Sequence, residues 1–221
     1  ELESELGEGR RLWQGAEEWR ALAGRLARYS GLPAVAPPPA LQATLRPYQI
    51  EGLAWMRFLH EQGLSGILAD DMGLGKTVQV IAHLLALREA AAAATPPVAL
   101  PPSLVVCPKS VLPNWQAELA RFAPQLKVLA LAGSDRQRAR RQLAQADVVL
   151  TTYPVLAREV EALAAQRFEL VVLDESQMVK NPATLAARAA RKLDAAQRLC
   201  LTGTPLENHL GEFWAQFDFL L

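Results

Sequence analysis

The fold is decided by the stretch Gly66-Ile67-Leu68-Ala69-Asp70-Asp71-Met72-Gly73-Leu74-Gly75-Lys76-Thr77. A short apolar run passes into a glycine-rich turn, and the turn ends in Gly-Lys-Thr at the start of a long helical pattern. This arrangement predicts a phosphate-binding loop, in which backbone N–H groups and the helix N-terminus cradle anionic oxygens. We expect the ammonium of Lys76 to reach the phosphates of a nucleotide and the hydroxyl of Thr77 to bind Mg²⁺. The other loop residues expected to contact the nucleotide are Asp71, Met72, Gly73, Leu74 and Gly75.

Strand-like and helix-like segments alternate after this loop. Apolar runs occupy residues 66–69, 104–107, 128–131, 148–151, 170–173 and 199–201. Helical patterns occupy residues 77–89, 111–121, 136–146, 155–165 and 183–195, and an Ala/Pro-rich loop is expected at 90–102. Continuous apolar strands separated by helices predict an α/β fold, a mostly parallel sheet with helices on both faces.

The N-terminal part of the chain has a different character. Residues 11–29 have the spacing of an amphipathic helix, and the Pro-rich stretch 33–39 cannot be helical. A second helix is expected at 47–60, with Pro47 in its first turn. We therefore predict a helical appendage and linker at 1–40 and a nucleotide-binding lobe at 41–221.

Composition limits the classes of function. Lys plus Arg and Asp plus Glu number 23 each, so the formal net charge is zero. This balance argues against a free-standing electrostatic binder of nucleic acid, although it allows a local basic cleft. The two cysteines, Cys107 and Cys200, lie in apolar runs and are expected to be buried thiols. No apolar stretch is long enough to cross a bilayer, so no membrane partner is expected.

A pair of carboxylates follows the apolar run 170–173. In an open α/β sheet the carboxyl ends of the strands form the ligand crevice, so Asp174 and Glu175 should face the phosphate loop. Asp174 would then hold Mg²⁺ through water, and Glu175 would act as the general base for the attacking water. The alternative is a solvated acidic turn at a strand end.

Four motifs occur in a fixed order along the chain, and together they carry a family resemblance. They are Leu45-Arg46-Pro47-Tyr48-Gln49, Ala69 to Thr77, Asp174-Glu175-Ser176-Gln177 and Leu201-Thr202-Gly203-Thr204-Pro205-Leu206-Glu207-Asn208. The chain from 41 to 221 resembles the first lobe of the Swi/Snf-type ATPases, which are DNA translocases of helicase superfamily two. Asp70 stands where the general phosphate-loop pattern has glycine, and that substitution is typical of this family.

The resemblance implies a RecA-like P-loop NTPase lobe that uses ATP and Mg²⁺ and acts on double-stranded DNA. It also implies a second lobe beyond Leu221 that supplies a catalytic arginine, so this chain alone should hydrolyse ATP poorly. A DNA-bound protein is a possible cargo. The implied location is the cytoplasm, in association with a bacterial nucleoid, or the nucleus if the source is eukaryotic.

The resemblance also assigns roles to individual residues. Gln49 would contact the adenine, and Gln177 would couple the nucleotide state to the neighbouring motif at 202–204. Lys109 and Ser110, within a segment that continues to Asn114-Trp115, and Thr151 and Thr152 would contact the nucleic-acid backbone. Each has a simpler alternative: Gln49 as a helix cap, Lys109 as a solvated lysine, and the threonines as β-branched residues that end a strand.

Two other functions compete with a DNA translocase. One is an RNA-acting helicase of the same superfamily. A helicase of the DEAD-box type would carry Asp-Glu-Ala-Asp and Ser-Ala-Thr, where this chain has Asp-Glu-Ser-Gln and Leu-Thr-Gly-Thr-Pro. The other is a nucleotide-gated interaction module without turnover, which the presence of Lys76, Thr77, Asp174 and Glu175 disfavours.

Overall fold

The computed structural model describes residues 24, 31–133, 136–203 and 210–221. Residues 34–221 form one compact unit. The amphipathic helix predicted at 11–29 lies, apart from Gly24, outside the described residues.

A single parallel sheet forms the centre of this unit. Among the described residues it contains six strands in the order β1-β6-β5-β2-β4-β3. Every neighbouring pair is parallel, as predicted. The strands are β1 (Gly66–Leu68), β2 (Ser103–Cys107), β3 (Val128–Leu131), β4 (Val148–Thr152), β5 (Arg167–Asp174) and β6 (Asp194–Leu201). β2 and β4 are buried along their whole length, which explains why their sequences are continuously apolar rather than alternating.

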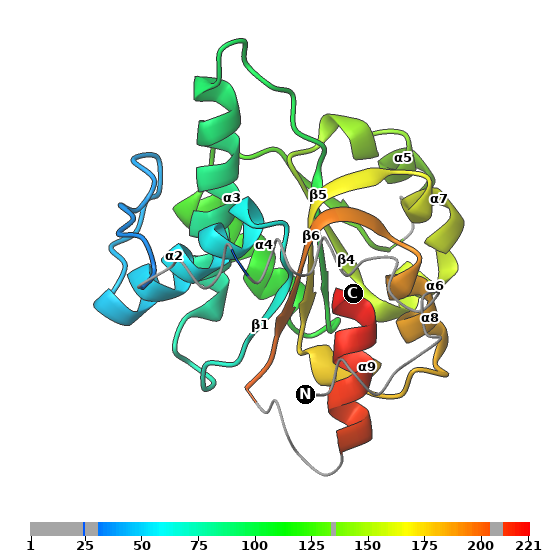
Figure 1. Cartoon of the computed structure of the whole chain (residues 1–221). Coiled ribbons are helices and arrows are strands. Elements are labelled where there is room, and N and C mark those ends of the chain that lie inside the picture. The colour runs from blue at the N-terminus through cyan, green and yellow to red at the C-terminus, as the bar shows by residue number, and fades with distance from the viewer. Residues whose placement is uncertain (1–23, 25–30, 134–135, 204–209) are drawn as a thin grey trace, which may run out of the picture. The chain divides into compact units, whose positions relative to one another are not determined.

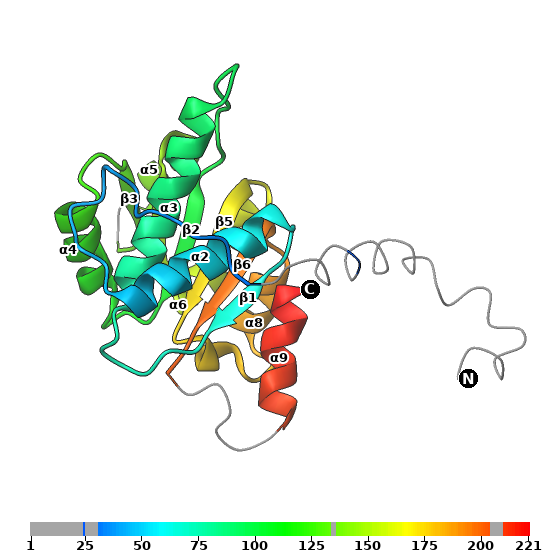
Figure 2. The same ribbon diagram turned by 60° about the vertical axis from the view of Figure 1, so that its left-hand side comes forward.

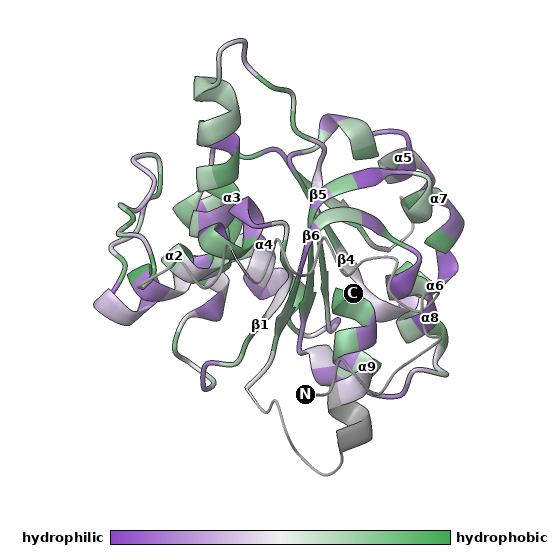
Figure 3. Ribbon diagram, in the orientation of Figure 1, coloured by the Kyte–Doolittle hydropathy of each residue, from purple (hydrophilic) through white to green (hydrophobic). Residues whose placement is uncertain are grey.

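Helices cover both faces of the sheet (Figures 1 and 2). One apolar core lies between the sheet and α2 (Pro47–Glu61), α3 (Lys76–Ala93) and α4 (Leu112–Phe122). A second core lies on the other face, under α5 (Arg136–Arg140), α6 (Tyr153–Arg158), α7 (Val160–Ala164), α8 (Leu185–Arg191) and α9 (Leu210–Leu220). Figure 3 shows the same division, with apolar residues concentrated in the strands between the two helical layers. The predicted α/β class is confirmed.

Helix ends depart from the sequence prediction in ways that have physical causes. α3 extends to Ala93, because the alanine-rich start of the predicted loop favours helix. The helix predicted at 136–146 is instead α5 followed by the short 3₁₀ helix η1 (Leu143–Gln145). The helix predicted at 155–165 is two helices that meet at Glu159, and Pro154 lies in the first turn of α6. α8 ends at Arg191 because β6 begins at Asp194.

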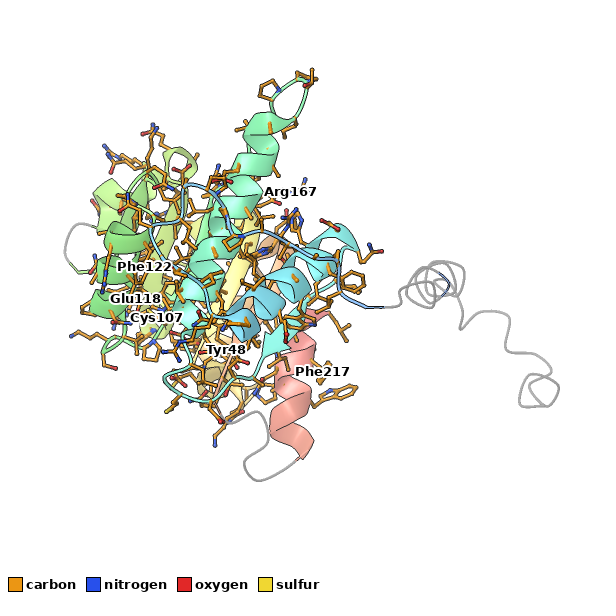
Figure 4. All side chains as sticks on the ribbon, turned by 90° about the vertical axis from the view of Figure 1, so that its left-hand side faces the viewer. Tyr48, Cys107, Glu118, Phe122, Arg167 and Phe217 are labelled. Atoms are coloured by element: carbon orange, nitrogen blue, oxygen red, sulfur yellow. The ribbon has the colours of Figure 1, made fainter. Side chains whose placement is uncertain are left out.

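The parallel arrangement brings the carboxyl ends of all strands to one edge of the sheet. β6 lies between β1 and β5, with Leu201 in register with Leu68 on one side and Asp174 on the other. Figure 4 shows Tyr48 and Cys107 toward this edge and Arg167, the first residue of β5, toward the opposite end. The segments that follow β1, β6 and β5 therefore meet, and they include the phosphate loop and the acidic pair.

Candidate nucleotide-binding site

The phosphate loop connects β1 to α3 and depends on two glycines. Gly73 and Gly75 have φ values of 83° and 77°, a left-handed conformation that glycine adopts without steric cost. A Cβ atom on Gly75 would lie 2.6 Å from the amide nitrogen of Gln49. Residues 71–74 are exposed, in the part of the loop where the sequence predicts the phosphates.

Lys76 folds back onto the loop that precedes it. Its Nζ donates to the carbonyl oxygens of Asp70 at 2.6 Å and Asp71 at 3.1 Å. Both acceptors are neutral carbonyls, which an anionic phosphate oxygen would outcompete because charge-assisted hydrogen bonds are stronger. The side chain is thus held at the mouth of the loop and is not part of the apolar core.

The side chain of Asp70 ties the loop to the first turn of α3. Its Oδ2 accepts a 2.9 Å hydrogen bond from Nε2 of Gln79, which is completely buried. Gly52 on α2 makes room for this pair, because a Cβ atom there would collide with Oε1 of Gln79. The sequence analysis missed Gln79; the available signal was a single amide within the otherwise apolar run from Val78 to Ala82.

Helix α2 braces the loop from the other side. Nε2 of Gln49 and the hydroxyl of Tyr48 each donate to the carbonyl oxygen of Leu74 at 3.0 Å. Oε1 of Gln49 accepts a 2.9 Å bond from the backbone N–H of Arg46, so both polar ends of this amide have protein partners. The structure therefore gives Gln49 a role in holding the loop, and its predicted contact with adenine stays a prediction.

Asp174 is the last residue of β5, and its carboxylate is buried. Oδ2 accepts a 2.7 Å bond from the indole Nε1–H of Trp115, and Oδ1 accepts a 3.0 Å bond from the backbone N–H of Glu175. Burial raises the pKa of the Asp174 carboxyl group, while the bond from Trp115 opposes that shift. The acidic pair is therefore a structured element, and the alternative of a solvated turn does not describe Asp174.

Glu175 turns the chain sharply after β5. Its φ and ψ values of 50° and 56° are left-handed, a conformation that is uncommon for any residue except glycine. Such local strain is concentrated at functional sites. The turn leads into the 3₁₀ helix η2 (Ser176–Val179), which carries Gln177.

Gln177 connects the acidic pair to the end of β6. Its Nε2 donates to Oε2 of Glu175 at 2.7 Å, and its Oε1 accepts from the hydroxyl of Thr202 at 3.2 Å. The backbone N–H of Thr202 donates to the carbonyl of Leu68 at the end of β1. A Cβ atom on the next residue, Gly203, would lie 3.1 Å from the side chain of Met72 in the phosphate loop. The structure thus brings together the phosphate loop, the acidic motif at 174–177 and the motif that begins at Leu201. The fourth motif, at 45–49, contacts the loop through Tyr48 and Gln49.

The comparisons with known proteins agree with this geometry. The profile of the SNF2-related domain matches residues 48–221, which is more than half of the chain. The chain belongs to the SNF2-related domain family. The SWI2/SNF2 ATPase core of Sulfolobus solfataricus, solved in complex with dsDNA, is 41% identical and has a TM-score of 0.76. That alignment covers 85% of this chain and 38% of the Sulfolobus chain.

Two curated relatives illustrate the range of the family. YwqA of Bacillus subtilis, which bears the name of an ATP-dependent helicase/translocase, is 41% identical over 208 residues. The TATA-binding protein-associated factor MOT1 of Saccharomyces cerevisiae is 42% identical over 192 residues. These matches cover 93% and 83% of this chain but only 22% of YwqA and 10% of MOT1. The SNF2-related chain therefore spans a small part of the length of these relatives.

The residues predicted to contact nucleic acid do not share one environment. Lys109 and Ser110 are exposed in the turn that follows β2 of the SNF2-related chain. Thr151 is completely buried, and its hydroxyl donates to the carbonyl of Leu131 at 3.0 Å. Thr152 is 5% exposed. Both threonines end a buried strand, as in the simpler alternative, and their predicted contact with nucleic acid stays a prediction.

Two further residues had been given no role from the sequence. Nε2 of His60 lies 2.7 Å from a carboxylate oxygen of Glu169, and Nε2 of His83 lies 2.8 Å from Oε1 of Gln197. Both pairs join helices to strands far along the chain, so no local sequence pattern could reveal them. Both cysteines are buried and free, as predicted, and burial raises the pKa of each thiol to about 12.

The described part of the SNF2-related chain lacks two features, a membrane-spanning helix and an acidic or thiol-rich metal cluster. It contains no helix long and apolar enough to span a membrane. It also contains no group of three or more His, Cys, Asp or Glu side chains able to hold a metal ion.

Proposed function

We propose that this chain is the ATP-binding lobe of a Swi/Snf-type DNA translocase, which couples ATP hydrolysis to movement on double-stranded DNA. The observation that carries the proposal is the hydrogen-bonded series from Glu175 through Gln177 to Thr202, beside the phosphate loop. This series connects the acidic pair to the end of β6, and the residue after Thr202 lies beside Met72 of the phosphate loop.

The residues at the sheet edge fit a magnesium nucleotide. The glycines keep the loop open to phosphate, Lys76 supplies a positive charge, and Thr77 and Asp174 supply oxygen ligands at opposite sides of β6. Mg²⁺ is bound through one or two carboxylates together with water and phosphate oxygens, so it needs no larger acidic cluster. When bound, it would neutralise charge on the phosphates.

Glu175 is the proposed general base. Its carboxylate is partly exposed and is oriented by Nε2 of Gln177, whereas the carboxylate of Asp174 is committed to Trp115 and to the backbone. The two acidic residues therefore have environments suited to different tasks, one positioned as a ligand and the other free to accept a proton. Gln177 would transmit the state of this base to Thr202.

The proposed nucleic acid is duplex DNA, as in the Sulfolobus complex. Lys109 and Ser110 present an exposed cation and hydroxyl beyond the carboxyl end of β2. The second lobe, which would form the other wall of the DNA groove and supply the arginine, would come from outside residues 41–221. A protein bound to the DNA would be the cargo, in the bacterial nucleoid or a nucleus.

The lobe itself is proposed to comprise residues 41–221, with 1–40 as an appendage. Leu41 and Leu45 are buried against the first apolar core, so the packed unit extends N-terminal to the family match.

Replacing Lys76 with alanine tests the nucleotide site. Titration of a fluorescent ADP analogue should show affinity lowered ~10–100-fold, because a hydrogen bond to a charged group contributes about 1.5–3 kcal/mol. The thermal unfolding midpoint should stay unchanged, since the ammonium bonds only to loop carbonyls. Lys127→Ala, at an exposed lysine preceding β3, is the matched control. Equal affinity of the Lys76 variant and the parent would refute the site.

The nature of the nucleic acid requires a separate experiment. ATP turnover should be measured with duplex DNA, with RNA and with neither, using a protein that contains both lobes. Stimulation by duplex DNA is expected. Stimulation by RNA alone would favour an RNA helicase, and binding of ATP without turnover under any condition would favour the interaction module.

A further inference from the structure

The carboxyl end of β5 is held from both faces of the sheet. The indole N–H of Trp115 donates to the carboxylate of Asp174, and the hydroxyl of Tyr153 donates to the backbone carbonyl of the same residue, each at 2.7 Å. Trp115 belongs to the core under α2, α3 and α4, and Tyr153 belongs to the opposite core. Figure 1 shows α4 and α6 on the two sides of the sheet. Both donors are buried, so water does not compete for either bond.

Trp115 is joined to the surface by a short, continuous series of backbone hydrogen bonds. The carbonyl of Pro108 accepts from Val111 and Leu112, and the carbonyl of Val111 accepts from Trp115. Lys109 and Ser110 lie within this turn and are exposed. A displacement of the turn would therefore move the indole ring and with it the hydrogen bond to Asp174.

The two donors fix different parts of Asp174. Tyr153 fixes the backbone, while Trp115 and the N–H of Glu175 each use one lone pair on one carboxylate oxygen. Each carboxylate oxygen has two lone pairs, so one on each oxygen remains for a metal ion or its bound waters. Without the indole, Oδ2 would lose the hydrogen bond that fixes its orientation, and the carboxylate could rotate away from the metal.

We propose that Trp115 is a positioning residue, which aims the Asp174 carboxylate at the metal of a bound nucleotide and links it to the exposed turn at 108–111. Tyr153 fixes the backbone of Asp174, so that the hydrogen bond from Trp115 sets the direction of the side chain alone. The proposal rests on the nucleotide site proposed above. In the sequence, Trp115 only ends the segment expected to contact nucleic acid, and its side chain is completely buried.

Trp115→Phe tests the proposal by comparing nucleotide binding with and without metal. Loss of an outer hydrogen bond to a metal-binding carboxylate typically lowers metal affinity ~10–100-fold. In Mg²⁺, we therefore expect a fluorescent ADP analogue to bind the Trp115→Phe variant ~10-fold more weakly than it binds the parent. In EDTA, the two proteins should bind the analogue equally well. Trp55→Phe is the control, because Trp55 packs partly buried against the same core, near Gly66 and away from Asp174. It should match the parent in both conditions.

Each result of this comparison has a defined meaning. Equal losses in Mg²⁺ and in EDTA would make Trp115 a structural residue and overturn the proposal. A variant that matches the parent in Mg²⁺ would overturn it as well. If the parent itself binds no nucleotide, the proposed function fails first, so the two failures are distinguishable.

The proposal can also be tested on the parent chain, so that the test does not depend on whether Trp115→Phe folds. The indole N–H signal of Trp115 can be assigned in a proton–nitrogen correlation spectrum as the signal that Trp115→Phe lacks. If the variant does not fold, the Trp115 signal can be assigned by elimination, with Trp→Phe variants at the other four tryptophans of the sequence. The Trp115 signal should shift with ADP plus Mg²⁺ and stay in place with ADP plus EDTA. Identical positions in the two samples would overturn the proposal.

Discussion

Glu175 has an unusual backbone conformation that its neighbours maintain. A left-handed residue other than glycine costs of order 1–3 kcal/mol and persists only where the surroundings impose it. Here the N–H of Glu175 donates to Asp174 and its carboxylate accepts from Gln177. The conformation thus keeps the two acidic side chains in separate hydrogen-bond environments.

Glu175→Gln should separate binding from hydrolysis. The amide can still accept from Gln177, so we expect the affinity for ATP to stay unchanged. In a protein that contains both lobes, single-turnover hydrolysis should fall ~10²–10⁴-fold, because general base catalysis typically contributes that factor. Glu161→Gln, at an exposed position on α7, is the matched control. A variant with the parental rate would assign the base elsewhere, and a loss of affinity would make Glu175 a ligand or structural residue.

Individual site residues differed in how readily the sequence revealed them. Lys76, Asp174 and Glu175 could be predicted because each follows an apolar run at the carboxyl end of a strand. The contact of Trp115 with Asp174 could not be predicted, because the fold brings together two residues 59 positions apart. Gln79 was missed although its partner Asp70 is only 9 positions away. For the threonines of β4 the sequence left two alternatives open, because a strand end is equally compatible with burial and with a surface contact.

Strands were easier to predict than helix ends for a related reason. A strand covered on both faces must be apolar throughout, so its sequence alone marks it. The end of α8 depends on where β6 begins, and the order of the strands depends on pairings between distant segments. β6 also carries a buried Gln197, whose amide donates to the carbonyl of Met56 in α2 and accepts from His83 in α3.

The contact between α3 and β6 predicts how stability depends on pH. Burial lowers the pKa of His83 to about 4, from 6.5. Its Nε2 donates to Gln197, and its Nδ1 is buried with no hydrogen-bond partner among the described residues. Between pH 6.5 and 4, His83 is therefore mostly protonated in the unfolded chain and mostly neutral in the folded chain. The free energy of unfolding should fall by about 3 kcal/mol between pH 6.5 and 4 from this residue.

Urea unfolding at several pH values within this range provides the measurement. His83→Gln removes the titrating group, so the variant should lose less stability than the parent as the pH falls. Glu169 also contributes acid sensitivity, since the hydrogen bond from His60 lowers its pKa. Its contribution is present above its ordinary pKa of 4.5 and is lost at lower pH, mostly below the range of His83. Equal pH dependence in parent and variant would contradict the assignment to His83.

The charge of the complete chain sets its expected behaviour toward DNA. With 23 basic and 23 acidic residues, few phosphates can be neutralised beyond a local patch around Lys109. Burial of Thr151 and Thr152 reduces that patch further. We expect labelled duplex DNA to bind no more tightly than about 10⁻⁶–10⁻⁴ M at physiological salt, the range of non-specific binding.

Fluorescence anisotropy and an ATPase assay on residues 1–221 would measure both consequences of this architecture. DNA affinity should fall as salt rises, and Lys109→Ala should reduce the slope of log affinity against log salt by about one. Lys127→Ala, an exposed lysine outside the proposed surface, should leave the slope unchanged. ATP turnover should hardly respond to DNA, because the proposed arginine and the other wall of the groove belong to a second lobe. Tight binding with strong stimulation would show that this lobe is self-sufficient and would contradict a divided active site.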